Sequence, residues 1–136
     1  MAGPSIFSRI VAGEIPCHRV YETDHVLAFL DINPLAEGHA LVIPKRPVER
    51  LDELTPDEAA ELGRAVREVA VRVMRVVGAP AYNVLQNNGS LAGQEVPHVH
   101  FHIIPRREGD GLGYRWRPQK VAPEVLAALA ARIAGT

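Results

Sequence analysis

The pattern of apolar and polar positions along the 136 residues predicts five short strands and one long helix. From Leu62 to Val76, apolar residues recur every three or four positions, as on one face of an amphipathic helix. Because the strands follow one another with a single long helix inserted, the pattern favours an antiparallel α+β sheet over alternating β-α-β units. Five stretches are rich in β-branched and aromatic residues and end at turn-forming residues, as strands do: residues 18–22, 26–32, 38–44, 81–87 and 97–105.

Signals at both ends of the long helix indicate where it begins and ends. Thr55 can act as the N-cap, Pro56 suits the first helical position, and Glu58 completes a capping box. Gly78 follows the last apolar position and is typical of a helix C-cap. The many valines and alanines on this helix hint at an additional buried face. Two shorter apolar-periodic stretches predict short helices near the ends of the chain: residues 7–13 and 123–133.

Composition and charge narrow the functional classes. Nearly half of the residues (47%) are apolar, and the length suits a single domain. The formal net charge of −1 argues against a dedicated nucleic-acid binder. A single cysteine cannot form an internal disulfide, no signal peptide is visible, and no apolar run approaches the roughly 20 residues of a membrane span. We therefore expect a soluble cytoplasmic protein without nucleic-acid or membrane partners.

The densest candidate chemistry is a row of three histidines, His98, His100 and His102, which alternate with Val99 and Phe101. In a strand the three imidazoles would share one face and lie within about 7 Å of each other. A lone histidine in a strand is most often an ordinary core or surface residue. Packing alone does not require three of them in strict alternation, so the row indicates a chemical site.

Such a row could bind a metal or attack phosphorus. Three neutral imidazoles form catalytic zinc sites in other proteins. Here, however, all three come from one strand and form a line, and Cys17 and the hydroxyls of Ser5 and Ser8 offer no well-placed fourth ligand. A central imidazole nucleophile, whose neighbours orient it and bind phosphate oxygens, fits the row better.

The run from His98 to Ile104 resembles the signature of the histidine-triad (HIT) family, in particular nucleotide hydrolases and transferases of the Hint-like bacterial type. The resemblance implies one HIT domain over residues 1–136, with a core of about 5–107 and a C-terminal extension from 108 to 136. It also implies a five-stranded antiparallel sheet with the long helix on one face, and a homodimer. Four further blocks resemble the family in the same order: residues 29–34, 38–45, 87–89 and 92–94.

The resemblance implies cleavage at the α-phosphate of a purine, typically adenosine, nucleotide conjugate, without metal or cofactor. His100 would be the nucleophile and form a nucleotidyl-histidine that water then cleaves. His98 would hold or polarise the site, and His102 would donate to a phosphate oxygen or to the leaving group. Phosphoramidate cleavage, dinucleoside polyphosphate hydrolysis and phosphorolysis all stay open.

The same resemblance suggests which residues form the nucleotide pocket. The carboxylate of Asp31 can accept both ribose hydroxyls, although an aspartate before Asn33 and Pro34 also suits a turn. Amides of asparagine, glutamine and glycine can bind phosphate oxygens without a metal. The expected set comprises Phe29, Ile32 and Leu41 around the base, Asp31 at the ribose, and His39, Asn87, Gly93, Gln94 and Glu95 near the phosphate.

Two positions depart from the family pattern. Many members carry a zinc-binding Cys-x-x-Cys where this chain has Ser5 to Ser8, so we expect no zinc there. Glu95 occupies a position, three before the triad, that is commonly serine or threonine. An ionised carboxylate cannot donate a hydrogen bond and repels phosphate, so Glu95 is expected to affect leaving-group preference.

The sequence leaves three other interpretations open. The stretch from Arg106 to Arg117 combines four arginines with glycines and two aromatic residues, and it could be a solvated tail or a flap over the leaving-group side. The whole chain could also be a nucleotide-binding sensor or scaffold with residual turnover. A metal-dependent enzyme built on the histidine row is the third possibility.

Overall fold

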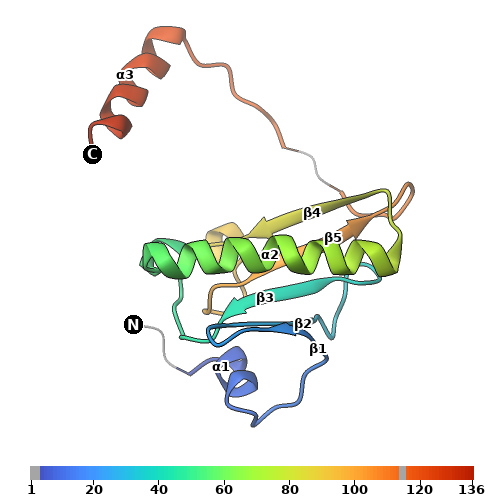
Figure 1. The fold of residues 1–136 in the computed structure, drawn as a ribbon. Helices are drawn as coiled ribbons and strands as arrows, with labels where there is room; N and C mark the ends of the chain where they lie inside the picture. Colours follow the sequence, from blue (N-terminus) through green and yellow to red (C-terminus); the bar gives the residue numbers. More distant parts are fainter. Residues whose placement is uncertain (1–3, 114–115) are drawn as a thin grey trace.

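The computed structural model describes residues 4–113 and 116–136, and it contains one five-stranded antiparallel sheet with a long helix, α2, across one face (Figure 1). The strand order is β1-β2-β3-β5-β4, so β5 lies between β3 and β4. The expected antiparallel α+β architecture is confirmed. The elements are α1 (Ile6–Val11), β1 (Arg19–Glu22), β2 (Val26–Leu30), β3 (Ala40–Pro44), α2 (Pro56–Val77), β4 (Ala81–Gln86), β5 (Phe101–Arg106) and α3 (Pro123–Ala134), with 3-10 turns at Leu51–Glu53 and Ser90–Ala92.

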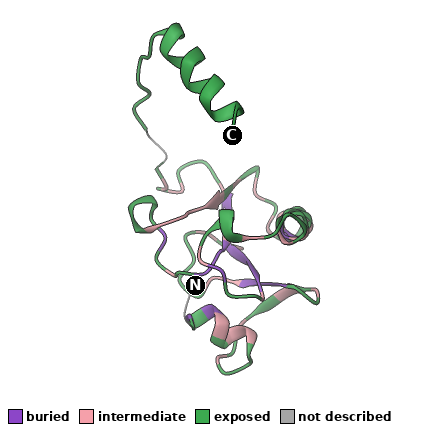
Figure 2. Ribbon diagram, turned by 90° about the vertical axis from the view of Figure 1, so that its left-hand side faces the viewer, coloured by how far each residue is buried: buried purple, intermediate pink, exposed green. Residues whose placement is uncertain are grey.

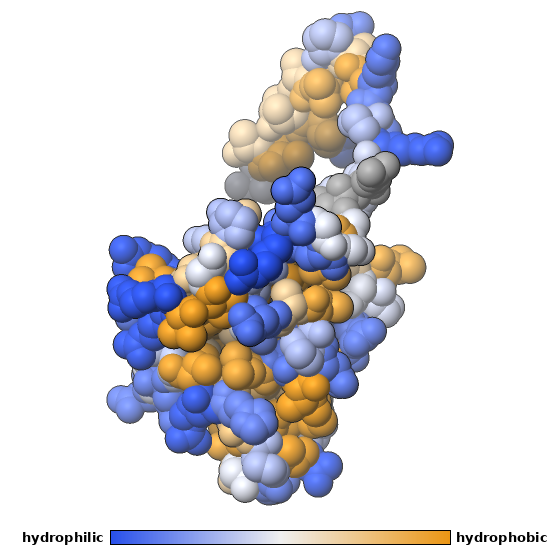
Figure 3. Space-filling model, turned by 90° about the vertical axis from the view of Figure 1, so that its right-hand side faces the viewer, coloured by the Kyte–Doolittle hydropathy of each residue, from blue (hydrophilic) through white to orange (hydrophobic). Residues whose placement is uncertain are grey.

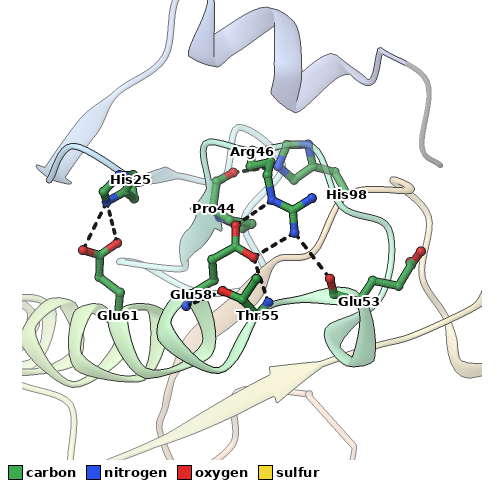
Figure 4. Close-up of polar contacts among 8 residues, drawn as sticks. All are labelled: His25, Pro44, Arg46, Glu53, Thr55, Glu58, Glu61 and His98. Carbon is green, nitrogen blue, oxygen red and sulfur yellow. Dashed lines mark hydrogen bonds and ion pairs between the residues drawn. The ribbon is translucent and has the colours of Figure 1, made fainter.

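The predicted caps of α2 are confirmed. The backbone N–H of Glu58 donates to the Thr55 hydroxyl (3.1 Å), and the backbone N–H of Thr55 donates to the Glu58 carboxylate (2.8 Å). Arg46 also binds this carboxylate through two hydrogen bonds of 2.6 and 2.7 Å (Figure 4). These bonds, with that of Arg46 the largest influence, lower the pKa of Glu58 to about 2. The start of α2 is thereby tied to the segment that follows β3.

Side chains of the strands alternate between two buried layers, one on each face of the sheet. The buried residues lie along the middle of the ribbon in Figure 2. In β2, Val26 and Ala28 belong to the layer beneath α2, whereas Leu27 and Phe29 belong to the layer that includes Phe7 of α1. Because both faces are covered, β2 and β3 consist almost entirely of apolar residues rather than alternating with polar ones. The second layer forms the floor beneath the region where the histidines gather.

The fifth strand begins later than the sequence pattern predicts. The prediction was residues 97–105, but β5 starts at Phe101, so His98 and His100 precede it. The ladders of β5 with β3 and with β4 both end at Phe101. Before that point the chain instead bonds to the loop after β3, through a 2.7 Å hydrogen bond from the Val99 N–H to the Val48 carbonyl. The three histidines therefore do not form one uninterrupted strand face.

The C-terminal helix α3 lies apart from the sheet, and none of its residues is buried (Figures 1 and 2). Its apolar side chains are accordingly open to solvent at the top of the view in Figure 3. The exposed large apolar residues of this helix are Val125, Leu126, Leu129 and Ile133. Among the described residues, every helix is too short or too polar to cross a membrane.

Gly38, immediately before the site residue His39, tests how closely α2 packs on the sheet. A Cβ there would lie 2.6 Å from Cγ2 of Val77 and 3.1 Å from Cγ1 of Val73, and its φ of +87° disfavours other residues. Gly38→Ala should lower the free energy of unfolding by about 2 kcal/mol, as overpacking typically does. Urea unfolding followed by circular dichroism measures this change.

Gly63, inside α2, supplies the matched control. A Cβ there meets no atom within 4 Å, so Gly63→Ala should raise the free energy of unfolding by about 0.5–1 kcal/mol through helix propensity. Equal stabilities of Gly38→Ala and wild type would contradict the tight approach of α2.

Candidate active site

A cavity of about 470 Å³ opens on the face of the sheet that carries α1. It brings together most of the residues that the sequence singled out, from segments between Ile6 and Ile104. A second cavity of about 560 Å³ lies beside α2, but it is lined mainly by valines and contains no histidine. The expected site residues that line the first cavity are Phe29, Asp31, Ile32, His39, Leu41, Asn87, Gly93, Glu95, His100 and His102.

Two expected site residues, His98 and Gln94, are not among the residues that line the cavity. Gln94 is buried, and its amide oxygen accepts from the Gly89 N–H (2.7 Å) while its amide nitrogen donates to the Glu49 carbonyl (2.7 Å). Both polar atoms of the side chain are thus engaged with the backbone. Gln94 positions the loop that precedes the triad.

His98 is fully buried, and both of its ring nitrogens are bonded. Nε2 donates to the Pro44 carbonyl at 2.8 Å (Figure 4), so Nδ1 is left to accept from the Ser5 hydroxyl at 3.1 Å. Ser5 also caps α1 by accepting from the Ser8 N–H. His98 therefore connects α1, the end of β3 and the triad segment, and it is a positioning residue.

His100 is oriented by the residue that precedes it by two positions. Its Nδ1 lies 2.7 Å from the His98 carbonyl oxygen, which can only accept, so Nδ1 carries the proton of the neutral ring. The lone pair is therefore on Nε2, on a ring that lines the cavity. An imidazole in this tautomer is a nucleophile with its attacking atom defined.

His102 has the opposite tautomer because of His39. The Leu35 N–H donates to Nδ1 of His39 at 3.0 Å, so the neutral His39 ring carries its proton on Nε2. That Nε2 lies 2.9 Å from Nδ1 of His102 and donates to it. The proton of His102 is consequently on Nε2, and this side chain offers the cavity a hydrogen-bond donor.

The surroundings keep these rings neutral. Burial lowers the pKa values of His39, His98 and His100, and burial together with the neighbouring His100 and His39 lowers that of His102 to about 4. The charges of Asp31 and Glu95 counteract part of this effect at His100. A neutral His100 keeps the lone pair that a nucleophile needs.

Asp31 forms the turn that its sequence context predicts, and it also lines the cavity. One carboxylate oxygen accepts from the Asn33 N–H at 2.9 Å, which is the expected turn. The other lies 3.6 Å from Nε2 of His39, and the residue lines the cavity. The turn thus fixes the carboxylate beside the histidines instead of replacing a functional role.

Among the described residues, the group that could hold a metal includes only one member of the histidine row, His102. Ligand atoms of Asp31, His39 and His102 all lie within 4.8 Å of one another, which would suit a divalent cation. A cation there would have to displace the proton that His39 donates to His102. His98 cannot join it, because its two ring nitrogens already bond to Ser5 and Pro44.

Some contributors were not predicted from the sequence. Phe7 of α1 contacts the rings of His98 and His100 edge-on, with centroid distances of 5.9 and 5.1 Å. Leu35 acts through its backbone N–H, which no residue pattern reveals. Only the apolar periodicity around Phe7 could have suggested a packing partner, and it does not specify which one.

The arginine-rich stretch after β5 is partly anchored. The Arg106 guanidinium donates to the carboxylate of Asp110 (2.8 and 3.2 Å), to Asn83 (2.8 Å) and to the Leu112 carbonyl (2.7 Å). Arg106 therefore stabilises the turn after the sheet. Tyr114 and Arg115, which belong to the same stretch, lie outside the described residues.

Nitrogen-15 NMR of the histidine side chains tests this arrangement directly. At pH 7 we expect His100 as the Nδ1–H tautomer, and His39, His98 and His102 as Nε2–H tautomers. On acidification His102 should protonate near pH 4. An Nε2–H tautomer at His100 would contradict its assignment as a ready nucleophile.

The same titration has a consequence for stability. The folded pKa values of the buried His39, His98 and His100 and of the half-buried His102 lie below the unfolded value of about 6.5. Between the folded and unfolded pKa values the unfolded chain therefore binds more protons than the folded chain. Their contribution to stability is complete above pH 6.5 and should be lost progressively as the pH falls towards 4.

Comparison with known proteins identifies the family of this chain. The HIT domain model matches residues 12–109. An uncharacterized HIT-like protein of Methanocaldococcus jannaschii is 56% identical over 106 residues, which cover 78% of this chain and 81% of that protein. An adenosine 5′-monophosphoramidase of Schizosaccharomyces pombe is 46% identical over 129 residues, which cover 94% of each chain.

Solved structures show the same fold. The crystal structure of a HIT family protein from Bacillus subtilis matches with a TM-score of 0.93 at 43% identity, over 98% of this chain and 96% of that one. The predicted resemblance is therefore confirmed, both in sequence and in three dimensions. This chain belongs to the HIT family.

Proposed function

We propose that this protein is a metal-independent nucleotide hydrolase that cleaves adenosine conjugates at the α-phosphate through a nucleotidyl-His100 intermediate. The observation that carries the proposal is the hydrogen bond from Nδ1 of His100 to the His98 carbonyl, which leaves the Nε2 lone pair for attack. Homologues of this family named as adenosine monophosphoramidases support nucleotide hydrolase activity. The S. pombe relative bears that name and aligns with nearly the whole chain.

Substrate binding follows from the chemistry of the cavity. Phe29, Ile32 and Leu41 offer an apolar surface for the adenine base, and Asp31 offers a carboxylate oxygen to the ribose hydroxyls. His102 and Asn87 provide neutral donors to the α-phosphate oxygens. Neutral donors that the fold holds in position can stabilise a pentavalent phosphorus without a metal ion.

The reaction then has two displacements. Nε2 of His100 forms a bond to the α-phosphorus as the bond to the leaving group breaks, and the ring becomes a nucleotidyl-imidazolium. The His98 carbonyl, which accepts the Nδ1–H, stabilises the positive charge that develops on the ring. Water next attacks the same phosphorus, and the P–N bond to His100 breaks. The nucleoside monophosphate then leaves, and the proton lost by the water passes to solvent or to the leaving group of the first displacement.

A homodimer is part of the same proposal. The edge strand β4 carries the exposed apolar side chains Tyr82 and Val84, and α3 carries an exposed apolar stripe. Exposed apolar surface of this kind favours a protein partner. The match to the B. subtilis crystal structure covers 98% of the chain, so it includes α3. We expect the partner to be a second copy of the chain, because in a homodimer the apolar stripe of both molecules would be covered.

His100→Ala should abolish turnover of an adenosine phosphoramidate, with a loss of more than about a thousandfold, because a missing nucleophile raises the chemical barrier. Affinity for adenosine monophosphate should fall far less, since the base and ribose contacts remain. Steady-state kinetics beside isothermal titration measures the two effects. Retention of more than about a hundredth of the activity would exclude covalent catalysis by His100.

A chelator provides the control for the metal-dependent alternative. Wild-type activity should persist after exhaustive dialysis against a chelator, whereas a metal enzyme using Asp31, His39 and His102 would lose it. Nucleotide binding with no turnover of any adenosine conjugate would favour the sensor or scaffold alternative.

Light scattering after gel filtration tests the homodimer. Wild type should elute as a dimer, and the double change Leu126→Glu with Leu129→Glu should weaken the dimer at least tenfold by placing charges on the apolar stripe of α3. Ala131→Glu, on the face of the helix opposite this stripe, is the matched control and should stay dimeric. A monomeric wild type would contradict this part of the proposal.

A further inference from the structure

The cavity is unusual for one that handles phosphate, because the charged side chains that line it are acidic. Asp31 and Glu95 line it, and no lysine or arginine is among its described lining residues. Proteins that bind polyphosphate groups usually clamp them with arginine, lysine or a metal ion. The cavity thus offers a carboxylate, rather than a cation, to whatever is attached to the α-phosphate.

The backbone on both sides of Glu95 is held in place. The preceding Gln94 is buried and bonded to the backbone of Gly89 and Glu49. The following Val96 accepts a 2.8 Å hydrogen bond from the His98 N–H through its carbonyl. The position of Glu95 beside the triad is therefore set by the fold, although its side chain is exposed.

The carboxylate of Glu95 is also available on the wall of the cavity that holds the triad. Within the described part of the chain, no lysine or arginine forms an ion pair with it. Its side chain lines the same cavity as His100 and His102. Burial lowers the pKa of His100, and the negative charge of Glu95 is one of the influences that oppose this lowering.

The two carboxylates have different partners. Asp31 is bonded to the Asn33 N–H and lies beside His39, at the end of β2 where the ribose is proposed to bind. Glu95 comes from the loop before the triad, on a different segment from Asp31. With Asp31 assigned to the ribose, Glu95 is the carboxylate that remains for the leaving group.

We propose that Glu95 determines which leaving groups the enzyme accepts, through its negative charge. The enzyme would then hydrolyse nucleotide conjugates that release an amine more efficiently than those that release a polyphosphate. This inference rests on the proposed function. A carboxylate stabilises a nitrogen that carries a proton, and it repels a leaving group that departs as an anion.

The chemistry balances without an additional acid. In the substrate form that Glu95 favours, the nitrogen bound to the α-phosphorus carries an extra proton and the phosphate one negative charge. Nε2 of His100 forms the new P–N bond, the old P–N bond breaks with its electron pair going to the amine, and a neutral amine leaves. After hydrolysis of the nucleotidyl-imidazolium, the released proton converts the amine to ammonium, which can pair with Glu95 on its way out.

The neutral state of His102 makes this role necessary. Its Nδ1 accepts from His39, and its pKa of about 4 shows that it carries no spare proton near neutral pH. It can donate a hydrogen bond but is poorly suited to give up its only ring proton. If the leaving nitrogen is already protonated and is bound by the Glu95 carboxylate, it does not need the ring proton of His102.

The test compares two substrates with the same adenylyl group, the adenosine 5′-phosphoramidate of a simple alkylamine and diadenosine tetraphosphate. We expect wild type to prefer the phosphoramidate. Glu95→Gln and Glu95→Ser should each lower the ratio of kcat/KM values, phosphoramidate over tetraphosphate, by at least tenfold, which corresponds to about 1.4 kcal/mol. Glu108→Gln, an exposed glutamate that does not line the cavity, should leave the ratio unchanged.

Salt dependence separates a charge effect from a change of shape. Screening should lower the wild-type ratio as ionic strength rises, whereas the ratio of Glu95→Gln should be nearly independent of salt. A ratio that Glu95→Gln leaves unchanged while both substrates are hydrolysed would overturn this inference but not the proposed function. The proposed function itself would fail if the wild-type enzyme hydrolysed neither substrate.

A variant that loses both activities equally while wild type retains them would also overturn the inference, because it would assign Glu95 a general role in the reaction. Unfolding curves of Glu95→Gln and Glu95→Ser should match that of wild type, because the side chain is exposed.

Discussion

The site depends on one hydrogen bond, from Nδ1 of His100 to the carbonyl oxygen of His98 at 2.7 Å. It defines the tautomer of His100 and leaves the ring lone pair on Nε2, the atom that attacks phosphorus in the proposed mechanism. The bond has this geometry because His98 is itself fixed, by the Pro44 carbonyl on one side of its ring and the Ser5 hydroxyl on the other. The ring of His100 is thus oriented by β3, α1 and the triad segment together.

The rest of the fold maintains this arrangement. The layer beneath α2 fixes β3 and β5 side by side, and the second layer brings Phe7 of α1 against the rings of His98 and His100. A second chain of hydrogen bonds, from the Leu35 N–H through His39 to His102, gives His102 the opposite tautomer. One fold therefore places a lone pair and a donor proton on neighbouring rings, whose centroids are 4.9 Å apart.

Much of the fold could be predicted from the sequence, because the signals were local. The caps of α2 at Thr55 and Gly78 and the periodic apolar positions between them are properties of neighbouring residues. The start of β5 could not be predicted, since it depends on where the ladders with β3 and β4 end and on the bond between Val99 and Val48. In the site, alternation correctly identified the histidine row but could not show that His98 faces away from the cavity lining, because its partners Ser5 and Pro44 are distant in sequence.

The central claim is that His100 becomes covalently nucleotidylated, and rapid-quench mass spectrometry tests it most directly. Enzyme mixed with an adenosine phosphoramidate, quenched in base within the first turnover and digested, should yield the peptide that contains His100 with one added adenylyl group, attached at Nε2. The modification should appear and decay at rates consistent with turnover. Unmodified peptide throughout a turnover, or an adenylyl group on His98 or His102 instead, would contradict the account.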